Sequence, residues 1–355
     1  MADFTLEEDL RGIAFDQLRD YEARWRDRQP FLQSRGYTLR PRLRPGWTPS
    51  WLTTGKHPLR SEDGIFLPVR PHLVDATRTS DGKLVYIKRV ETGDTESSLA
   101  IMLSSLSTRF DSRNHSVPVL DSFIDNEDPS ISYIVMPFLM EPNFPDFETV
   151  GEIVDFVDQV LEVRHFCPLD CSFDNIMMDC TAMYPRGLHP INTHSLPDGF
   201  TPVLQLPRRQ VGVTYYFIDY GISSYYPPGT SRGMVIGRDG RDQDVPELSD
   251  TKSYDPFAVD IFIIGNMLRL RFREEYSNVE FLAPIIAHAT ARDPAQRPSA
   301  QELLQEWTSQ RRQVSSLTKE WRLKRHDENL LASVVRDCLG MVAAVAHLLA
   351  FWRRY

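Results

Sequence analysis

Segments typical of strands and segments typical of helices are separated along this chain, which restricts the folds that it can adopt. Between residues 72 and 140, short runs rich in β-branched and aromatic residues alternate with polar turns. After Pro145 the apolar residues recur mostly at helical spacing, as in 149–166. Strands followed by helices favour the α+β class over an alternating α/β fold. We therefore expect a small β-rich lobe and then a larger, mainly helical lobe.

The β-rich region begins with a predicted hairpin. The runs HLVDATR (72–78) and KLVYIKRV (83–90) flank a polar turn that contains Asp81 and Gly82. An Asp-Gly pair between two strand-like runs is a strong signal for a tight antiparallel turn. The elements expected after this hairpin are a helix over 96–106 and two strands over 117–124 and 131–140.

The rest of the chain divides by composition. The Pro-, Arg- and Trp-rich run LRPRLRPGWTPSW (39–51) predicts an extended strap over a surface, and residues 180–212 predict a loop-like insertion. Helices are expected over 149–166, 255–272, 277–291 and 299–313. The predicted organisation is an N-terminal extension (1–64), a β-rich lobe (65–140), a helical lobe (141–313) and a C-terminal tail (314–355).

Charge and cysteine content exclude two classes of function. With 355 residues and a formal net charge of −9, the chain is no typical binder of nucleic-acid phosphates. The arginine clusters near 35–44 and 311–325 are predicted to be solvated faces. The four cysteines include the pair in CPLDC (167–171), but a zinc site would need a second pair or nearby histidines. We expect reduced, structural thiols, which suit a cytoplasmic or nuclear protein.

The two ends of the chain bear on location. The first twelve residues are acidic and polar, unlike a secretory signal. The apolar run CLGMVAAVAHLLAFW (338–352) is shorter than the roughly 17–25 residues of a membrane-spanning helix. A docking helix is the favoured interpretation of this run, and weak membrane association is the alternative.

Three oxygen-bearing side chains lie at the ends of predicted strands. The stretch LDCSFDNIMMD (169–179) places Asp170 and Asn175 five residues apart, just before a short apolar strand, and Asp219 ends the strand in FIDYGIS. Mg²⁺ takes one or two protein oxygens together with phosphate oxygens. Asn175 and Asp219 could supply those oxygens, and Asp170 could accept the proton of an attacking hydroxyl.

Two further charged residues need partners. Lys88 lies among apolar neighbours in the strand YIKRV, where it either points to solvent from an edge strand or holds phosphates beside a helical glutamate. Glu96 is the preferred partner and Glu91 the alternative. Farther on, VPE (245–247) precedes a helix, and we expect Glu247 to form a buried ion pair with Arg297.

These residues occur in the order that phosphoryl transfer requires in the protein-kinase fold. Over roughly residues 65–310 the sequence resembles a eukaryotic protein-kinase-like domain. It is similar above all to the divergent kinase-like proteins of fungi in its blocks YYFIDYGIS, DQDVPELSD and YDPFAVDIFIIGNML. The resemblance implies a bilobal fold and an ATP- and Mg²⁺-dependent phosphotransferase that acts on a protein hydroxyl.

Carried over to this sequence, the resemblance also implies a role for each site residue. Lys88 would hold the α- and β-phosphates with Glu96 as its ion-pair partner, and Asp170 would be the catalytic base. Asn175 and Asp219 would bind Mg²⁺. The adenine would lie against the hinge formed by Met136, Pro137, Phe138 and Leu139.

The sequence departs from the family at three places. The usual His-Arg-Asp is Pro168-Leu169-Asp170, no G-x-G-x-x-G precedes the hairpin, and Ser172 stands where Ser/Thr kinases carry a lysine. Gly64 is the only glycine near the position of the missing loop. Two alternatives therefore stay open, a pseudokinase that binds or scaffolds without transfer and a small-molecule kinase of related fold. His115, His189 and His194 are predicted to be surface histidines without a role.

Overall fold

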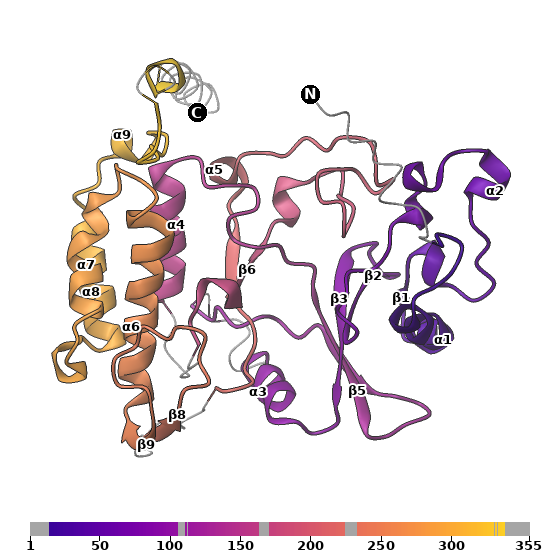
Figure 1. Cartoon of the computed structure of the whole chain (residues 1–355), viewed down its shortest axis with the longest axis horizontal. Helices are drawn as coiled ribbons and strands as arrows, with labels where there is room; N and C mark the ends of the chain where they lie inside the picture. The colour runs from indigo at the N-terminus through magenta and orange to yellow at the C-terminus, as the bar shows by residue number, and fades with distance from the viewer. Residues whose placement is uncertain are drawn as a thin grey trace. The chain divides into compact units, whose positions relative to one another are not determined.

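The computed structural model of this chain describes residues 14–105, 111, 113–162, 170–223, 233–329, 331 and 333–337. These residues form helices and antiparallel sheets, so the α+β class expected from the sequence is confirmed (Figure 1). The chain folds into two compact units. Unit 1 comprises Met1–Thr92, Val119–Phe138 and Tyr184–Leu206, and unit 2 comprises Gly93–Pro118, Leu139–Met183 and Pro207–Tyr355. The limits and the two-lobed kinase-like arrangement predicted from the sequence stay predictions.

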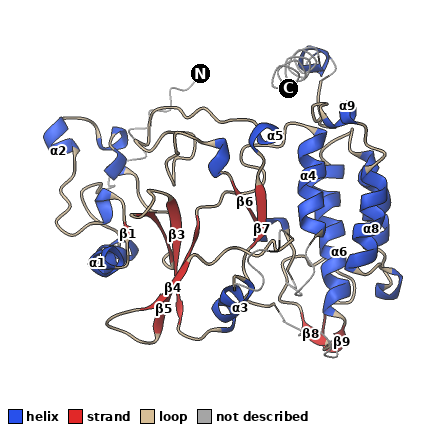
Figure 2. Ribbon diagram, turned by 180° about the vertical axis from the view of Figure 1, so that it is seen from behind, coloured by secondary structure: helices blue, strands red, loops and turns tan. Residues whose placement is uncertain are grey.

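Unit 1 is built on a five-stranded antiparallel sheet (Figure 2). The predicted hairpin is present, with Gly82 in the left-handed region (φ 71°) that its turn requires. The strands follow the spatial order β1-β2-β3-β5-β4. Their bounds are β1 Tyr37–Thr38, β2 Leu73–Arg78, β3 Leu84–Glu91, β4 Asp121–Ile124 and β5 Ile131–Pro137.

The N-terminal extension forms part of the core of unit 1. Helix α1 (Asp20–Ser34) contributes Trp25 and Leu32 to the same buried cluster as the sheet residues Val85, Ile87 and Val135. The strap predicted to cover a surface is itself buried here, since Leu39 and Leu43 belong to that cluster. Short helical turns follow along this extension: η1 Pro41–Leu43, α2 Trp51–Thr54, η2 Pro58–Arg60 and η3 Glu62–Gly64.

The arginine cluster at 35–44 is only in part the solvated face that the sequence predicted, because Arg35 and Arg44 are exposed whereas Arg40 and Arg42 are buried. Arg42 is fully buried and forms a bidentate pair with Glu22 on α1, with N···O distances of 2.9 and 3.0 Å. Arg40 is also buried and donates to Asp75 on β2 over 3.0 Å. Burial alone would raise the pKa of Glu22, but hydrogen bonds from Arg42 and from backbone amides bring it below its ordinary value.

Two histidines expected at the surface are buried. In unit 1, His189 is 1% exposed; its Nδ1 accepts from two backbone amides and its Nε2 lies 3.3 Å from Glu62. In unit 2, His115 is 4% exposed and its Nδ1 lies 2.9 Å from the carbonyl oxygen of Tyr215. The prediction was wrong for both because loop position alone does not reveal such partners, whereas His194 is exposed as expected.

Unit 2 is mainly helical; α8 packs against both α4 and α7, and α6 packs against α7 (Figure 1). Gly265 on α6 allows a close approach, since a Cβ there would lie 2.6 Å from the Cβ of Ala289 on α7. The α-helices are α3 Thr95–Leu103, α4 Val150–Leu161, α5 Arg208–Val211, α6 Pro256–Leu268, α7 Ala283–Ala289, α8 Ala300–Arg311 and α9 Ser316–Lys319. The segment predicted to end helix 149–166 and the Pro168-Leu169 pair lie outside the described residues.

Short elements complete unit 2. Two small antiparallel sheets pair β6 (Ile176–Asp179) with β7 (Thr214–Phe217) and β8 (Val235–Gly237) with β9 (Ser249–Tyr254). The remaining short helices are η4 Phe173–Asn175, η5 Thr181–Met183, η6 Arg269–Arg273, η7 Glu280–Leu282 and η8 Pro294–Gln296. Residues 180–212, predicted to be loop-like, contain only η5 and α5 as regular elements.

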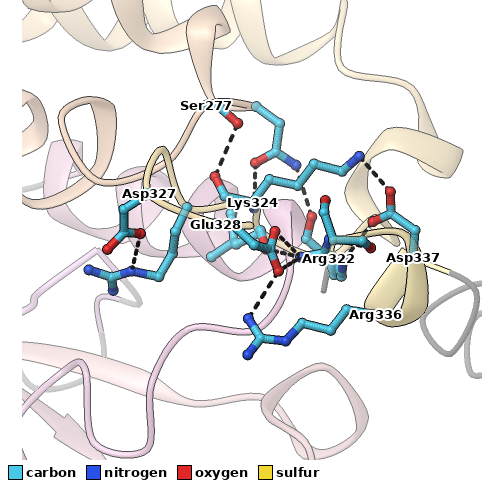
Figure 3. Close-up of polar contacts among 11 residues, drawn as sticks. Ser277, Arg322, Lys324, Asp327, Glu328, Arg336 and Asp337 are labelled. Carbon is cyan, nitrogen blue, oxygen red and sulfur yellow. Dashed lines mark hydrogen bonds and ion pairs between the residues drawn. The ribbon is translucent and has the colours of Figure 1, made fainter. Parts of the chain in front are cut away.

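The start of the C-terminal tail is held by a cluster of charges (Figure 3). Asp337 accepts from Arg322 over 2.6 Å and from Lys324 over 2.7 Å, and Glu328 accepts from both Arg322 and Arg336. Arg322 is 15% exposed, so this part of the predicted solvated arginine cluster is instead partly buried. The apolar run 338–352 and its predicted docking or membrane role lie outside the described residues.

Two other expectations concern the part of the chain that the structure describes. Cys171 and Cys180 are buried free thiols, as expected. Within this part of the chain, no helix combines the length and the hydropathy needed to cross a membrane.

Candidate functional site

The β6–β7 hairpin brings two of the predicted metal ligands to one end of a small sheet. Ile176 pairs with Phe217 at that end, and the backbone amide of Ile218 donates to the carbonyl oxygen of Asn175 over 2.9 Å. Asn175 directly precedes β6, and Asp219 follows β7 by two residues. Residues that are 44 positions apart in the sequence are therefore brought to the same end of this small sheet.

Asp219 has a backbone conformation that side chains rarely adopt. With φ at 65°, it is the only non-glycine residue with a positive φ in the described part of the chain. Its carboxylate is exposed and accepts from the amide of Gly221 over 3.3 Å. Because the left-handed region is unfavourable for L residues, a strained residue at a strand end is typical of a functional position.

Tyr220 fixes the chain immediately after Asp219. Its ring is 1% exposed, and its hydroxyl donates to the carbonyl oxygen of Phe217 over 2.8 Å while it accepts from the amide of Val117 over 3.2 Å. A buried tyrosine with both hydrogen bonds satisfied is a strong anchor. The exposed Asp219 is thus held by the buried residue that follows it.

Asp170 and Asn175 are joined side chain to side chain. The Nδ2 amide of Asn175 donates to Oδ2 of Asp170 over 2.8 Å and to the carbonyl oxygen of Asp170 over 3.1 Å. Both side chains are buried, with 8% and 2% of their surface exposed. Because Nδ2 is used by Asp170, the Oδ1 oxygen of Asn175 is the atom left to accept a donor or to bind a cation.

The surroundings of Asp170 favour its protonated form. Burial raises the pKa of its carboxyl above the ordinary value of 3.8, against the lowering effects of Arg241, Ser172 and Asn175. The next residue, Cys171, has a thiol whose pKa is raised well above 9.0 by burial and by the carboxylates of Asp260 and Asp170. Asp260 on α6 also hydrogen-bonds this thiol, which ties the segment that carries Asp170 to the helical core.

The structure adds a cluster of charges that the sequence had not indicated. The backbone amide of Arg241 lies 3.3 Å from Oδ1 of Asp170, and its guanidinium lies 3.7 Å from Oδ2. The same guanidinium contacts Asp174 at 3.2 Å, and Asp174 also meets Arg271 at 3.3 Å. Arg241 thus places a cation beside Asp170, where the sequence lacks the lysine found in Ser/Thr kinases. In the sequence, the one signal for this charge cluster is the dense run of charged residues RDGRDQD (238–244).

The predicted Glu247–Arg297 pair is present. The guanidinium of Arg297 donates to both carboxylate oxygens of Glu247, over 2.5 and 2.8 Å, and also to the carbonyl oxygens of Ala258 and Ala291. The Arg297 side chain is 1% exposed and stacks over the ring of Phe262 at 4.8 Å. The pair joins the segment before α6 to the loop before α8, so the sequence prediction is confirmed.

The predicted nucleotide-side residues lie in two units. Lys88 is on β3, which has β2 on one side and β5 on the other, so the edge-strand interpretation is wrong. Glu96 is in the first turn of α3, in unit 2, and its pairing with Lys88 stays a prediction. In the predicted hinge, Met136 and Pro137 end β5, Phe138 stacks on Tyr86 at 4.9 Å, and Leu139 begins unit 2.

Gly64 has a packing role. It lies in η3, where a Cβ would come within 2.1 Å of the carbonyl oxygen of Pro58. Its own amide donates to Ser61 over 2.9 Å. This glycine therefore allows two short helical turns to touch, and β1 is joined to β2 by residues 39–72 in place of a tight glycine loop.

No metal-binding group of three or more His, Cys, Asp or Glu side chains occurs among the described residues. Comparison with models of known protein families and with curated proteins finds no match to this chain.

Proposed function

We propose that this protein is an ATP- and Mg²⁺-dependent phosphotransferase of the protein-kinase type that acts on a protein hydroxyl. The observation that carries the proposal is the linked arrangement of Asp170, Asn175 and Asp219 at one end of the β6–β7 hairpin. The resemblance of the sequence to protein-kinase-like domains assigns the catalytic base and the two Mg²⁺ ligands to these same three positions.

The chemistry of each group supports its role. Asp170 is a carboxylate whose pKa is raised by burial, which makes it a better proton acceptor once it is ionised. Asn175 and Asp219 offer one amide oxygen and one exposed carboxylate, a donor set that suits Mg²⁺ completed by phosphate oxygens and water. With the metal and nucleotide bound, Mg²⁺ would neutralise charge on the transferred phosphoryl group.

The nucleotide-side assignments rest on the resemblance. Lys88 would hold the α- and β-phosphates and pair with Glu96, and the hinge Met136–Leu139 would contact the adenine. The central position of β3 and the partial burial of Lys88 support this role, because an ammonium group that is partly removed from water favours a polar partner.

A second candidate function is nucleotide or partner binding without transfer, as in a pseudokinase. The observation that favours it is the link between β1 and β2, in which Gly64 serves packing between η2 and η3. A glycine-rich flap that covers the phosphates closely contributes to transfer in protein kinases. Without it, nucleotide could bind while transfer stays weak.

Thermal melting with an ATP analogue, with and without Mg²⁺, tests nucleotide binding. A ligand at 100 times its Kd stabilises the folded state by about 2.7 kcal/mol. We expect a Mg²⁺-dependent increase in Tm for the wild type that is lost in Lys88→Met and Asp219→Asn. The matched controls are Lys83→Met in the β2–β3 turn and Asp327→Asn, both at exposed positions, and both should keep the wild-type shift.

Transfer itself is tested by Asp170→Asn. Loss of a catalytic base lowers the rate of transfer by about 10²- to 10⁴-fold. With γ-labelled ATP and a peptide library as substrate, we therefore expect labelled peptides with the wild type only. A normal nucleotide shift with no transfer by either protein would establish the binding-only alternative. No shift at any nucleotide concentration would refute both transfer and nucleotide binding, and would leave only a pseudokinase that binds protein partners.

A further inference from the structure

A groove of about 650 Å³ lies in unit 2 between residues 238–248, the end of α6 and the residues after α7. Ligand pockets usually measure about 300–1,000 Å³. Three arginines from separate segments line it, Arg238, Arg269 and Arg292, against one acidic residue, Asp244. We propose that this groove binds an extended peptide segment that carries anionic groups, either carboxylates or phosphates.

Two of the three arginines are open to an incoming ligand. Arg292 is exposed, and no carboxylate of the described chain lies within ion-pair distance of it. Arg238 is 57% exposed, and its carboxylate neighbour Asp250 is 74% exposed and lies 3.7 Å away. Exposed pairs of this kind contribute little to stability, so a ligand anion can replace Asp250 at little cost.

The third arginine is fixed in place. Asn266 is 1% exposed, and its Oδ1 accepts from Nε and Nη2 of Arg269 over 3.0 and 2.6 Å. Arg269 also contacts Glu274, while its contact with Asp244 is longer, at 3.4 Å. The guanidinium is therefore held by a buried amide, and the weak contact with Asp244 is the one that a ligand anion would exchange.

The apolar lining of the groove and the charge of the chain indicate a peptide ligand. The apolar residues Val245, Leu248 and Phe262 line the groove together with the arginines and are buried, which suits a side chain with both an apolar stem and an anionic end. The net charge of −9 disfavours long polyanions such as nucleic acids and anionic membrane surfaces. A short acidic segment would contact only the local positive charge of the groove.

The groove is close in sequence to the contact with Asp170. Arg241, whose amide lies 3.3 Å from Asp170, is three residues from both Arg238 and Asp244. An extended residue spans about 3.3 Å, so the chain between Arg241 and either Arg238 or Asp244 covers at most about 10 Å. Binding in the groove does not depend on transfer at Asp170.

Fluorescence anisotropy without nucleotide tests the proposal on the full chain. The probes are three labelled ten-residue peptides of one sequence that carry three glutamates, three glutamines, or three phosphoserines at the same positions. We expect the glutamate or phosphoserine peptide to bind at least tenfold more tightly than the glutamine peptide, and binding to weaken with added salt. Because a phosphoserine carries about −1.5 to −2 charges and a glutamate only −1, a fourth peptide with six glutamates matches the charge of the phosphoserine peptide. Tighter binding of the phosphoserine peptide than of this fourth peptide would identify phosphate as the preferred anion, and equal binding would identify charge alone.

Charge-reversal variants locate the binding. Arg292→Glu and Arg238→Glu should each weaken binding of the anionic peptide at least fivefold, and Arg312→Glu, at an exposed position outside the groove, should leave it unchanged. Circular dichroism checks that all three variants are folded. Equal binding of glutamate and glutamine peptides would overturn the proposal, as would equal loss in Arg292→Glu and Arg312→Glu. Full competition by low-millimolar inorganic phosphate would also overturn it, because the site would then recognise a small anion and not a peptide.

Discussion

The Nδ2 amide of Asn175 donates to the carboxylate of Asp170 over 2.8 Å and to its backbone carbonyl over 3.1 Å. One amide therefore orients the proposed base and leaves its own Oδ1 oxygen to accept a donor or to bind a cation. Replacing Asn175 by alanine removes a bond that lowers the pKa of Asp170, whose burial already raises it.

For Asn175→Ala we predict two separable effects. The rate of transfer should fall at all pH values because a Mg²⁺ ligand is lost. The acidic limb of the pH–rate profile should also move to higher pH, because the Asp170 carboxyl becomes harder to ionise. Initial rates measured from pH 4 to 9 at saturating Mg²⁺ check both. An unchanged acidic limb would contradict the role of Asp170 as the titrating base.

For Arg241→Ala we predict the same shift of the pH–rate profile as for Asn175→Ala, but without the loss of a Mg²⁺ ligand. The guanidinium and amide of Arg241 both lower the pKa of Asp170, but only the side chain is lost in this variant. The acidic limb should move to higher pH, while the rate at the high-pH plateau changes less than in Asn175→Ala. Arg312→Ala, at an exposed position, is the matched control and should keep the wild-type profile.

For Asp219→Gly we predict a gain in stability with a loss of nucleotide binding. Glycine adopts the φ of 65° without the cost of about 1 kcal/mol that an L side chain carries there. The free energy of unfolding, from urea denaturation, should therefore rise by up to about 1 kcal/mol, while the Mg²⁺-dependent shift in Tm with an ATP analogue disappears. A destabilised variant would show that the Asp219 carboxylate supports the fold itself.

For Arg297→Met we predict a large loss of stability. Removing one partner of a buried ion pair leaves the other charge uncompensated, at a cost of about 3–5 kcal/mol. Here Glu247 would keep a carboxylate that is 13% exposed and has lost both of its bonds to Arg297. The double variant Glu247→Leu/Arg297→Met should recover part of this loss, as measured by urea denaturation. If the single variant loses less than about 1 kcal/mol, the pair does not hold this segment to the loop before α8.

For Arg42→Leu we predict a reversed pH dependence of stability. In the wild type the pKa of Glu22 is lowered below 4.5, so its contribution is present above pH 4.5 and is lost as the pH falls through the lowered value. Without Arg42 the burial of Glu22 dominates and raises its pKa, so the variant should instead gain stability as the pH falls toward 4.5. Arg26→Leu, at a half-exposed position on the helix that carries Glu22, is the control, and parallel pH curves for Arg42→Leu and wild type would contradict this account.

Local signals in the sequence determined much of the architecture. The Asp81-Gly82 turn fixed the β2–β3 hairpin, because few other residues adopt the backbone that a tight turn requires. Helical spacing of apolar residues placed α4, which buries one face, and a long apolar run placed α6, which is buried on nearly all sides. The order of charged residues also predicted the Glu247–Arg297 pair, because either charge alone would be costly inside.

Only the tertiary structure decided which charges are buried and which lie beside the proposed base. Arg42 and His189 were expected at the surface, yet each is buried against a glutamate from a separate element. Arg241 reaches Asp170 across 71 residues of sequence. Composition and periodicity describe a residue and its near neighbours, whereas the state of a charged side chain depends on partners that only the folded chain brings within reach.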